Sequence, residues 1–201
     1  MNLLERNRRF FDTWARFYDH GPISWWLRAV QRQAILIANP HWGERILDAS
    51  CGTGHALKQM TCSGAKLAGI DLSPNMLERA QKNLAGLDVM LLNSDVEELP
   101  FSDASFDCVM TMEAFHHYPD QEQALRELFR VLRPEGRLLL VDINLFFEPA
   151  HRLFEMLEPG CVRINTKEQM RMLIKDAGFL VLEQRRIGIF AVATYARRPG
   201  P

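Results

Sequence analysis

Short apolar runs alternate with segments of helical periodicity through the middle of the chain. We expect strands over residues 45–49, 66–70, 89–92, 106–112 and 137–143, and helices over 54–60, 74–84 and 121–132. Strands that alternate with helices are typical of βαβ units, in which crossover helices join parallel strands. The pattern therefore predicts an α/β fold with a doubly wound, mostly parallel sheet.

Different patterns flank this alternation on both sides. Residues 1–40 carry apolar side chains at spacings of three and four, typical of helices, whereas residues 144–165 are aromatic, Met-rich and irregular. A helix over 166–177 and an antiparallel hairpin of 179–186 with 189–196 are expected at the end. We expect one domain over 1–201, made of a helical cap (1–40), a ligand-binding core (41–143), a substrate-cap insertion (144–165) and a C-terminal helix and hairpin (166–201).

The composition is that of an ordinary globular protein. A formal charge of −1 gives no basic field for nucleic acid, so nucleic acid is not an expected partner. The four cysteines form no CxxC pair, so we expect reduced thiols, a cytoplasmic location and no metal site. No apolar run reaches the roughly 18 residues that span a bilayer, so no transmembrane segment is expected.

The sequence ILDASCGTG at 46–54 ends an apolar strand with an acid and continues into a glycine turn that opens a helix. Gly52 and Gly54 allow a sharp turn and a close approach to a ligand, and the first amides of a helix attract an anion. Asp48 can attract an ammonium group. A ligand with an amino-acid end would satisfy both the acid and the loop amides.

Asp71 ends the second strand, about twenty residues beyond the glycine turn, where a carboxylate accepts hydrogen bonds from ribose hydroxyls. This position serves NAD and S-adenosylmethionine equally. A dinucleotide fingerprint would add a glycine three residues after Gly54, but Leu57 stands there. The missing glycine disfavours a pyrophosphate and favours a ligand such as S-adenosylmethionine.

Two further polar groups follow the third and fourth strands, at the sheet edge where open α/β sheets bind ligands. Asp95 is placed to accept a hydrogen bond from an adenine amino group, with Val96 against the ring. Glu113 is either a cofactor-site carboxylate or an exposed loop acid. The pair His116 and His117 either transfers protons or packs against its neighbours.

The motifs ILDASCGTG, GIDLSPNML, NSDVEELPFSDASFDCV, HHYPD and ELFRVLRPEGRLLLVD occur in this order. With them the chain resembles the class I S-adenosylmethionine-dependent methyltransferases of the type 11 group, and it is similar to the ubiquinone and menaquinone biosynthesis C-methyltransferases. The resemblance runs from about residue 11 to residue 196 and implies a Rossmann-like, seven-stranded sheet with a C-terminal antiparallel hairpin and an N-terminal helical cap. It also implies S-adenosyl-L-methionine as cofactor and S-adenosyl-L-homocysteine as product.

The resemblance also implies roles for individual residues. Asp71 would hold the ribose, Asp95 the adenine, and Tyr18 would close over the cofactor; Ser50 departs from the glycine usual in the family. The full set of cofactor-binding residues expected from pattern and resemblance is Tyr18, Asp48, Ala49, Ser50, Cys51, Gly52, Gly54, Asp71, Leu72, Met76, Asp95, Val96 and Glu113.

The expected activity is methyl transfer to a small, hydrophobic or aromatic acceptor, quinol-like or lipid-like, covered by residues 1–40 and 144–165. His116 or His117 would take a proton from a phenol or an activated ring carbon. Two alternatives stay open: an NAD-dependent oxidoreductase, disfavoured by Leu57 and Asp95, and a non-catalytic S-adenosylmethionine-binding subunit.

Overall fold

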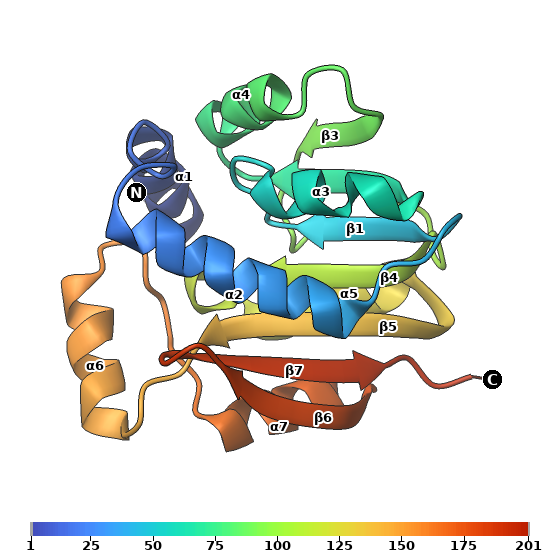
Figure 1. Cartoon of the computed structure of the whole chain (residues 1–201). Helices are drawn as coiled ribbons and strands as arrows, with labels where there is room; N and C mark the ends of the chain where they lie inside the picture. The colour runs from blue at the N-terminus through green and yellow to red at the C-terminus, as the bar shows by residue number, and fades with distance from the viewer. Residues whose placement is uncertain (1, 201) are drawn as a thin grey trace.

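A computed structural model of the chain describes residues 2–200 and forms one seven-stranded sheet with helices around it (Figure 1). The strands are β1 (Arg45–Ala49), β2 (Lys66–Asp71), β3 (Val89–Asn93), β4 (Phe106–Met112), β5 (Leu132–Ile143), β6 (Leu180–Ile187) and β7 (Ala191–Arg197). Their order is β3-β2-β1-β4-β5-β7-β6. Strands β1 to β5 pair in parallel, and β7 pairs antiparallel with both β5 and β6. The predicted doubly wound sheet with a C-terminal hairpin is confirmed.

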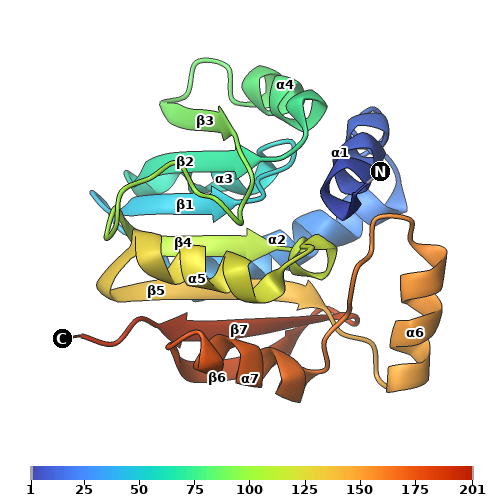
Figure 2. The same ribbon diagram turned by 180° about the vertical axis from the view of Figure 1, so that it is seen from behind.

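Helices cover both faces of the sheet, as the two opposite views show (Figures 1 and 2). Apolar side chains of α2 (Pro22–Ala38), α3 (His55–Met60) and α4 (Pro74–Asn83) join one buried cluster. Those of α5 (Gln121–Val131) and α7 (Lys167–Asp176) join the other, on the opposite face. Because β4 lies between these layers, all seven of its residues are buried, and five of them are apolar, with Asp107 and Thr111 the exceptions. There are two short 3₁₀ turns: η1 (Thr61–Ser63) has no buried residue, whereas all three residues of η2 (Phe115–His117) are buried.

The remaining helices, α1 (Leu3–Trp14) and α6 (Glu148–Leu157), lie at the end of the sheet toward which the arrows of β1, β4 and β5 point (Figures 1 and 2). They therefore stand beside the carboxyl ends of the parallel strands. The strand order reverses between β1 and β4, since β2 and β3 lie on one side of β1 and β5 on the other side of β4. Open α/β sheets bind ligands at such a reversal.

Two predictions of local structure were wrong. The segment 144–165, expected to be irregular, contains α6, which has an amphipathic sequence and a proline in its first turn. Strand β5 begins at Leu132 rather than at Arg137, because Leu132 pairs with Phe106 before a register shift in the β4–β5 ladder. Among the helices of residues 2–200, none combines the length and the apolar character needed to cross a membrane.

Candidate active site

The glycine turn after β1 forms the floor of a cleft at the carboxyl edge. Ser50, Gly52 and Gly54 have φ angles of 144°, 52° and 78°, in the region that favours glycine. A Cβ atom on Gly54 would lie 2.8 Å from Leu84 Cδ1, so this glycine lets the turn pack against α4. Ser50 stands in the same backbone region without being a glycine, and its Oγ lies 2.8 Å from the Tyr118 hydroxyl. The fold thus accommodates Ser50, where the resemblance leads us to expect glycine, with a strained backbone and one hydrogen bond.

Asp71, at the end of β2, ties the glycine turn to the start of α4. Its Oδ2 accepts a hydrogen bond from the Gly52 amide (2.8 Å), and its Oδ1 accepts one from the Ser73 amide (2.9 Å). Burial raises the pKa of Asp71 to about 6, although these two amides act in the opposite direction. Each carboxylate oxygen keeps a lone pair free, which is the capacity that a pair of ribose hydroxyls requires.

Asp48 is a buried acid at the end of β1. Its side chain is 2% exposed, and its Oδ1 has no hydrogen-bond partner among the described residues. Burial, followed by the nearby Asp71 carboxylate, raises its pKa to about 7. A cation at this point would satisfy the unpartnered oxygen and return the carboxyl to its ionised form. An ammonium group is such a cation.

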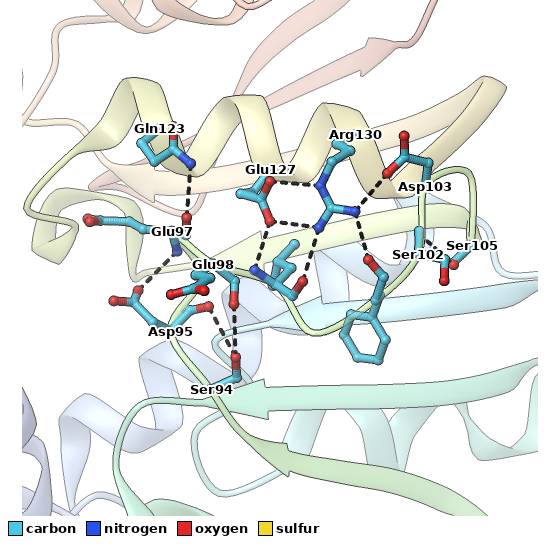
Figure 3. Close-up of polar contacts among 12 residues, drawn as sticks. Ser94, Asp95, Glu97, Glu98, Ser102, Asp103, Ser105, Gln123, Glu127 and Arg130 are labelled. Atoms are coloured by element: carbon cyan, nitrogen blue, oxygen red, sulfur yellow. Dashed lines mark hydrogen bonds and ion pairs between the residues drawn. The ribbon is translucent and has the colours of Figure 1, made fainter.

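The loop after β3 forms another wall of the cleft with Asp95 and Val96. The Glu97 amide donates to Asp95 Oδ1 (3.0 Å), which orients the carboxylate. Figure 3 shows how α5 holds this loop: Arg130 donates to the carbonyls of Leu99 and Phe101, and Glu127 accepts from the Leu99 amide. Arg130 does not line the cleft itself. It fixes the loop that carries Asp95, the residue predicted to bind the adenine.

The segment after α1 covers the glycine turn. Asp19 accepts hydrogen bonds from the Thr53 hydroxyl (2.7 Å) and lies 3.0 Å from His55 Nε2. This anchor places the Tyr18 ring over Gly52, where a Cβ atom would lie 3.8 Å from the ring. Burial raises the pKa of the Tyr18 phenol well above its ordinary value, so the hydroxyl stays neutral.

Nine of the predicted cofactor-binding residues line this cleft together. They are Tyr18, Ser50, Gly52, Asp71, Leu72, Met76, Asp95, Val96 and Glu113. The other four, Asp48, Ala49, Cys51 and Gly54, lie in β1 or the turn beside it without lining the cleft. Sequence reasoning missed Leu4, Asn7 and Phe11 of α1, which also line it. Their helical spacing was visible in the sequence, but the surface they cover was not.

A second, larger cavity of about 950 Å³ adjoins the cleft. It is lined mainly by apolar side chains from the N-terminal helices, such as Trp14 and Trp26, and from residues 143–159, such as Phe154. Phe11, Tyr18, Glu113 and His117 line both spaces, so the cleft and the cavity share one wall. Residues of both predicted cap segments line this apolar space.

Glu113 lies in the shared wall, and its interpretation as an exposed loop acid was wrong. Both of its carboxylate oxygens are buried without a hydrogen-bond partner among the described residues, and its φ angle is 55°. Burial, with the Asp142 carboxylate nearby, raises the pKa of Glu113 well above its ordinary value. A strained acid with a buried carboxylate, between a cleft and a cavity, is typical of a functional site.

The two histidines of η2 have different environments. Burial would lower the pKa of His116, but the carboxylates of Asp142 and Glu158 outweigh it and raise this pKa to about 10. Burial, with His116 beside it, lowers the pKa of His117 well below its ordinary value. His116 lines only the larger cavity, whereas His117 lines both spaces. Both residues are buried, and proton transfer by this pair stays a prediction.

The groups that line the cleft suit the ribose and the purine of S-adenosylmethionine. The free lone pairs of Asp71 suit the ribose, whereas Asp48, predicted to meet the ammonium, is buried and does not line the cleft. Leu72, Met76 and Val96 supply apolar contact for a purine, with Asp95 at its edge.

Comparison with known proteins agrees with this geometry. Residues 47–140 match the model of the family described as "Methyltransferase domain". The chain is 41% identical over 147 residues to 27-O-demethylrifamycin SV methyltransferase of Amycolatopsis mediterranei, covering 68% of this chain and 54% of that protein. It is 28% identical over 211 residues to demethylmenaquinone methyltransferase of Staphylococcus aureus, covering 90% and 88%.

The fold has solved counterparts. A SAM-dependent methyltransferase from Aquifex aeolicus superposes with a TM-score of 0.76 at 21% identity, covering 93% of this chain and 98% of that one. The chain spans about half the length of the first curated relatives it matches. Its core motifs, its strand order and these matches agree, and the chain belongs to the methyltransferase domain family of S-adenosylmethionine-dependent enzymes.

Proposed function

We propose that this protein transfers the methyl group of S-adenosylmethionine to a small, apolar or aromatic acceptor bound in the 950 Å³ cavity. The observation that carries the proposal is the shared wall: Tyr18, Glu113 and His117 line both the cofactor cleft and the cavity. A donor in the first space and an acceptor in the second would therefore lie side by side. Two reactants held in this way react as one unit, which lowers the entropic part of the barrier.

The bound cofactor supplies an electrophilic methyl group, and the protein's part is positioning and the exclusion of water. Asp48, Asp71 and Asp95 hold the ends and the middle of the cofactor. The α1 helix covers the cleft and is held there by two hydrogen bonds. Asp12 accepts one from the Ser73 hydroxyl (2.6 Å), and Asn7 donates one to the His117 carbonyl (2.5 Å). These contacts would keep solvent away from the reacting atoms.

The cavity favours an acceptor with an aromatic or quinol-like ring and one ionisable oxygen. Its walls are mostly apolar, and its polar groups gather at one point, where Glu113, His116 and His117 lie. His117, which lines both spaces, is the histidine proposed to meet an acceptor hydroxyl. The relatives named above are methyltransferases of a demethylrifamycin and of demethylmenaquinone, and small-molecule acceptors of this kind support the proposal. We place the activity in the cytoplasm, in keeping with four cysteines that are unpaired in the described structure.

Calorimetry with S-adenosylhomocysteine, with NADH titrated in parallel, tests the cofactor. Saturable binding of S-adenosylhomocysteine without an NADH signal is expected, and binding of NADH alone would refute the proposal. Binding of S-adenosylhomocysteine without turnover on a panel of quinols, phenols and amine lipids would instead favour a non-catalytic subunit.

A pair of variants tests the acceptor cavity. Leu145→Trp places a large ring in the cavity and should raise KM for the acceptor at least tenfold, while the affinity for S-adenosylhomocysteine stays unchanged. Leu153→Trp makes the same change at an exposed position of α6 and should leave both unchanged. Equal kinetics for the two variants would place the acceptor elsewhere.

A further inference from the structure

A cluster of side chains that can bind a metal lies in the wall of the 950 Å³ cavity proposed to bind the acceptor, the acceptor cavity. His116 and His117 come from η2, and Glu158 follows the end of α6. The chain after Glu158 is held against η2, because the amides of Val162 and Arg163 both donate to the His116 carbonyl, at 2.8 and 3.1 Å. The sequence offers no metal-ligand spacing here, since the fold brings the glutamate to the histidine pair from a distant segment.

The spacing of the three groups suits one small cation. Glu158 Oε2 lies 3.5 Å from His116 Nε2, and Glu158 Oε1 lies 3.7 Å from His117 Nε2. One ligand atom from each residue lies within 4.8 Å of the others. Two ligands of a tetrahedral ion, each about 2.1 Å from it, are roughly 3.4 Å apart. The cluster therefore needs only small side-chain movements to bind an ion.

His116 turns Nε2 toward Glu158, because Asp142 engages its other ring nitrogen. Asp142 Oδ1 lies 2.5 Å from His116 Nδ1, which leaves Nε2 buried and without a hydrogen-bond partner among the described residues. His116 is only 1% exposed. A carboxylate on the far nitrogen of a histidine is the arrangement that orients metal-binding imidazoles and makes them better ligands.

The surroundings carry an excess of acidic groups. Both oxygens of Glu113, Asp142 Oδ2 and Glu158 Oε2 are buried without hydrogen-bond partners in the described structure. Buried carboxylates without partners are costly, and a bound cation offsets that cost. A divalent ion at this point would offset part of the negative charge of these carboxylates.

We propose that His116, His117 and Glu158 bind a divalent transition-metal ion of the zinc type, through Nε2 of both imidazoles and the glutamate carboxylate, with Asp142 orienting His116. Two histidines and one glutamate form a donor set that zinc uses when one coordination position stays open. Because all three residues line the acceptor cavity, the open position would face an acceptor there and polarise its oxygen. Metal binding does not depend on the proposed methyl transfer.

Titration of the full chain tests this proposal directly. Protein treated with a chelator and dialysed is titrated with Zn²⁺ by calorimetry, and with Co²⁺ by visible absorption, which reports the ligand field. We expect one ion per chain, a Co²⁺ band typical of four-coordination, and a Zn²⁺-dependent rise in Tm. Glu158→Gln, at a partly exposed position, should weaken binding at least tenfold, and Asp142→Asn should weaken it about 10- to 100-fold.

Matched controls separate this site from surface binding. Glu148→Gln makes the same change at an exposed position in the first turn of α6, and His41→Gln removes an exposed imidazole. Both should bind the ion as the unmodified chain does. Absence of a stoichiometric ion, or equal Zn²⁺ affinities for folded Glu158→Gln and Glu148→Gln, would overturn the proposal. Calorimetry with S-adenosylhomocysteine on the same samples reports the cofactor site independently.

Discussion

The affinity for S-adenosylhomocysteine should fall steeply as the pH falls from 8 to 5. Two carboxyl groups of the cofactor site, Asp48 and Asp71, have pKa values raised by burial to about 7 and about 6. The ligand's ammonium and ribose hydroxyls interact best with ionised carboxylates. A carboxyl that is protonated before binding must therefore lose its proton to bind the ligand well, and this costs affinity at low pH.

The size of the effect follows from the two pKa values. Each pH unit below the pKa of a group that must ionise costs about tenfold in affinity, or about 1.4 kcal/mol. At pH 5, Asp48 is two units below its pKa and Asp71 one unit below, so the combined loss relative to pH 8 is about a thousandfold. In Asp48→Asn only Asp71 contributes to the pH dependence, so the affinity should fall about tenfold between pH 8 and pH 5. At pH 8 the substitution itself should already weaken binding by about 1 to 3 kcal/mol.

The stability of the free protein should respond to pH with the opposite sign. A carboxyl whose pKa is higher in the folded state than its unfolded value of about 3.9 makes the folded protein bind more protons between those two values. The contribution of Asp48 and Asp71 to the free energy of unfolding is therefore present at low pH and is lost as the pH rises from about 4 to about 7.

Calorimetry of S-adenosylhomocysteine binding at each half pH unit, with urea unfolding in the same buffers, checks both signs. Asp88→Asn, at an exposed position, is the control for a lost negative charge and should keep the full pH dependence of binding. An affinity that stays constant between pH 5 and 8, or an unchanged slope in Asp48→Asn, would refute the reasoning.

Three further changes test the parts that shape the cleft. Ser50→Gly should be more stable to urea than Ser50→Ala by about 1 to 2 kcal/mol, because only glycine relieves the φ angle of 144°; an equally stable alanine variant would argue against strain. Arg130→Met should lower the free energy of unfolding by about 1 to 3 kcal/mol and speed hydrogen exchange in residues 94–105, since it releases the loop from α5; unchanged exchange there would contradict this. Tyr18→Ala should speed dissociation of S-adenosylhomocysteine at least tenfold in stopped-flow measurements, whereas Phe17→Ala, at an exposed neighbour, should not.

Strands at the centre of the sheet could be predicted from the sequence almost to the residue. Strands β1 and β4 have the predicted bounds, because both are covered on two faces and are therefore rich in apolar residues. The start of β5 could not be predicted, since it depends on pairing between Leu132 and Phe106. The sequence analysis did not predict α6. Its apolar residues, such as Phe154, line a cavity that exists only in the folded chain.

The cofactor half of the site was predictable for a related reason. Asp48, Gly52, Asp71 and Asp95 each end a strand or follow one closely, and in a parallel sheet all such positions meet at one edge. Alternation and turn signals therefore locate them without any knowledge of packing between distant segments. The residues that cover the cleft from α1 gave no such signal, because an amphipathic helix does not specify which surface it packs against.

The acceptor half depends on contacts that no local pattern encodes. The sequence identifies Glu113 only as an acid after a strand, whereas in the folded chain its carboxylate oxygens are buried and it lines a cavity together with residues of α1 and α6. Glu158 reaches the histidine pair because backbone amides of Val162 and Arg163 bind the His116 carbonyl. Such long-range contacts can change with a few substitutions in the cap segments while the sheet edge stays the same. One cofactor site can in this way serve many acceptors, and the acceptor of this protein must be identified from its cavity and the polar cluster in the cavity wall.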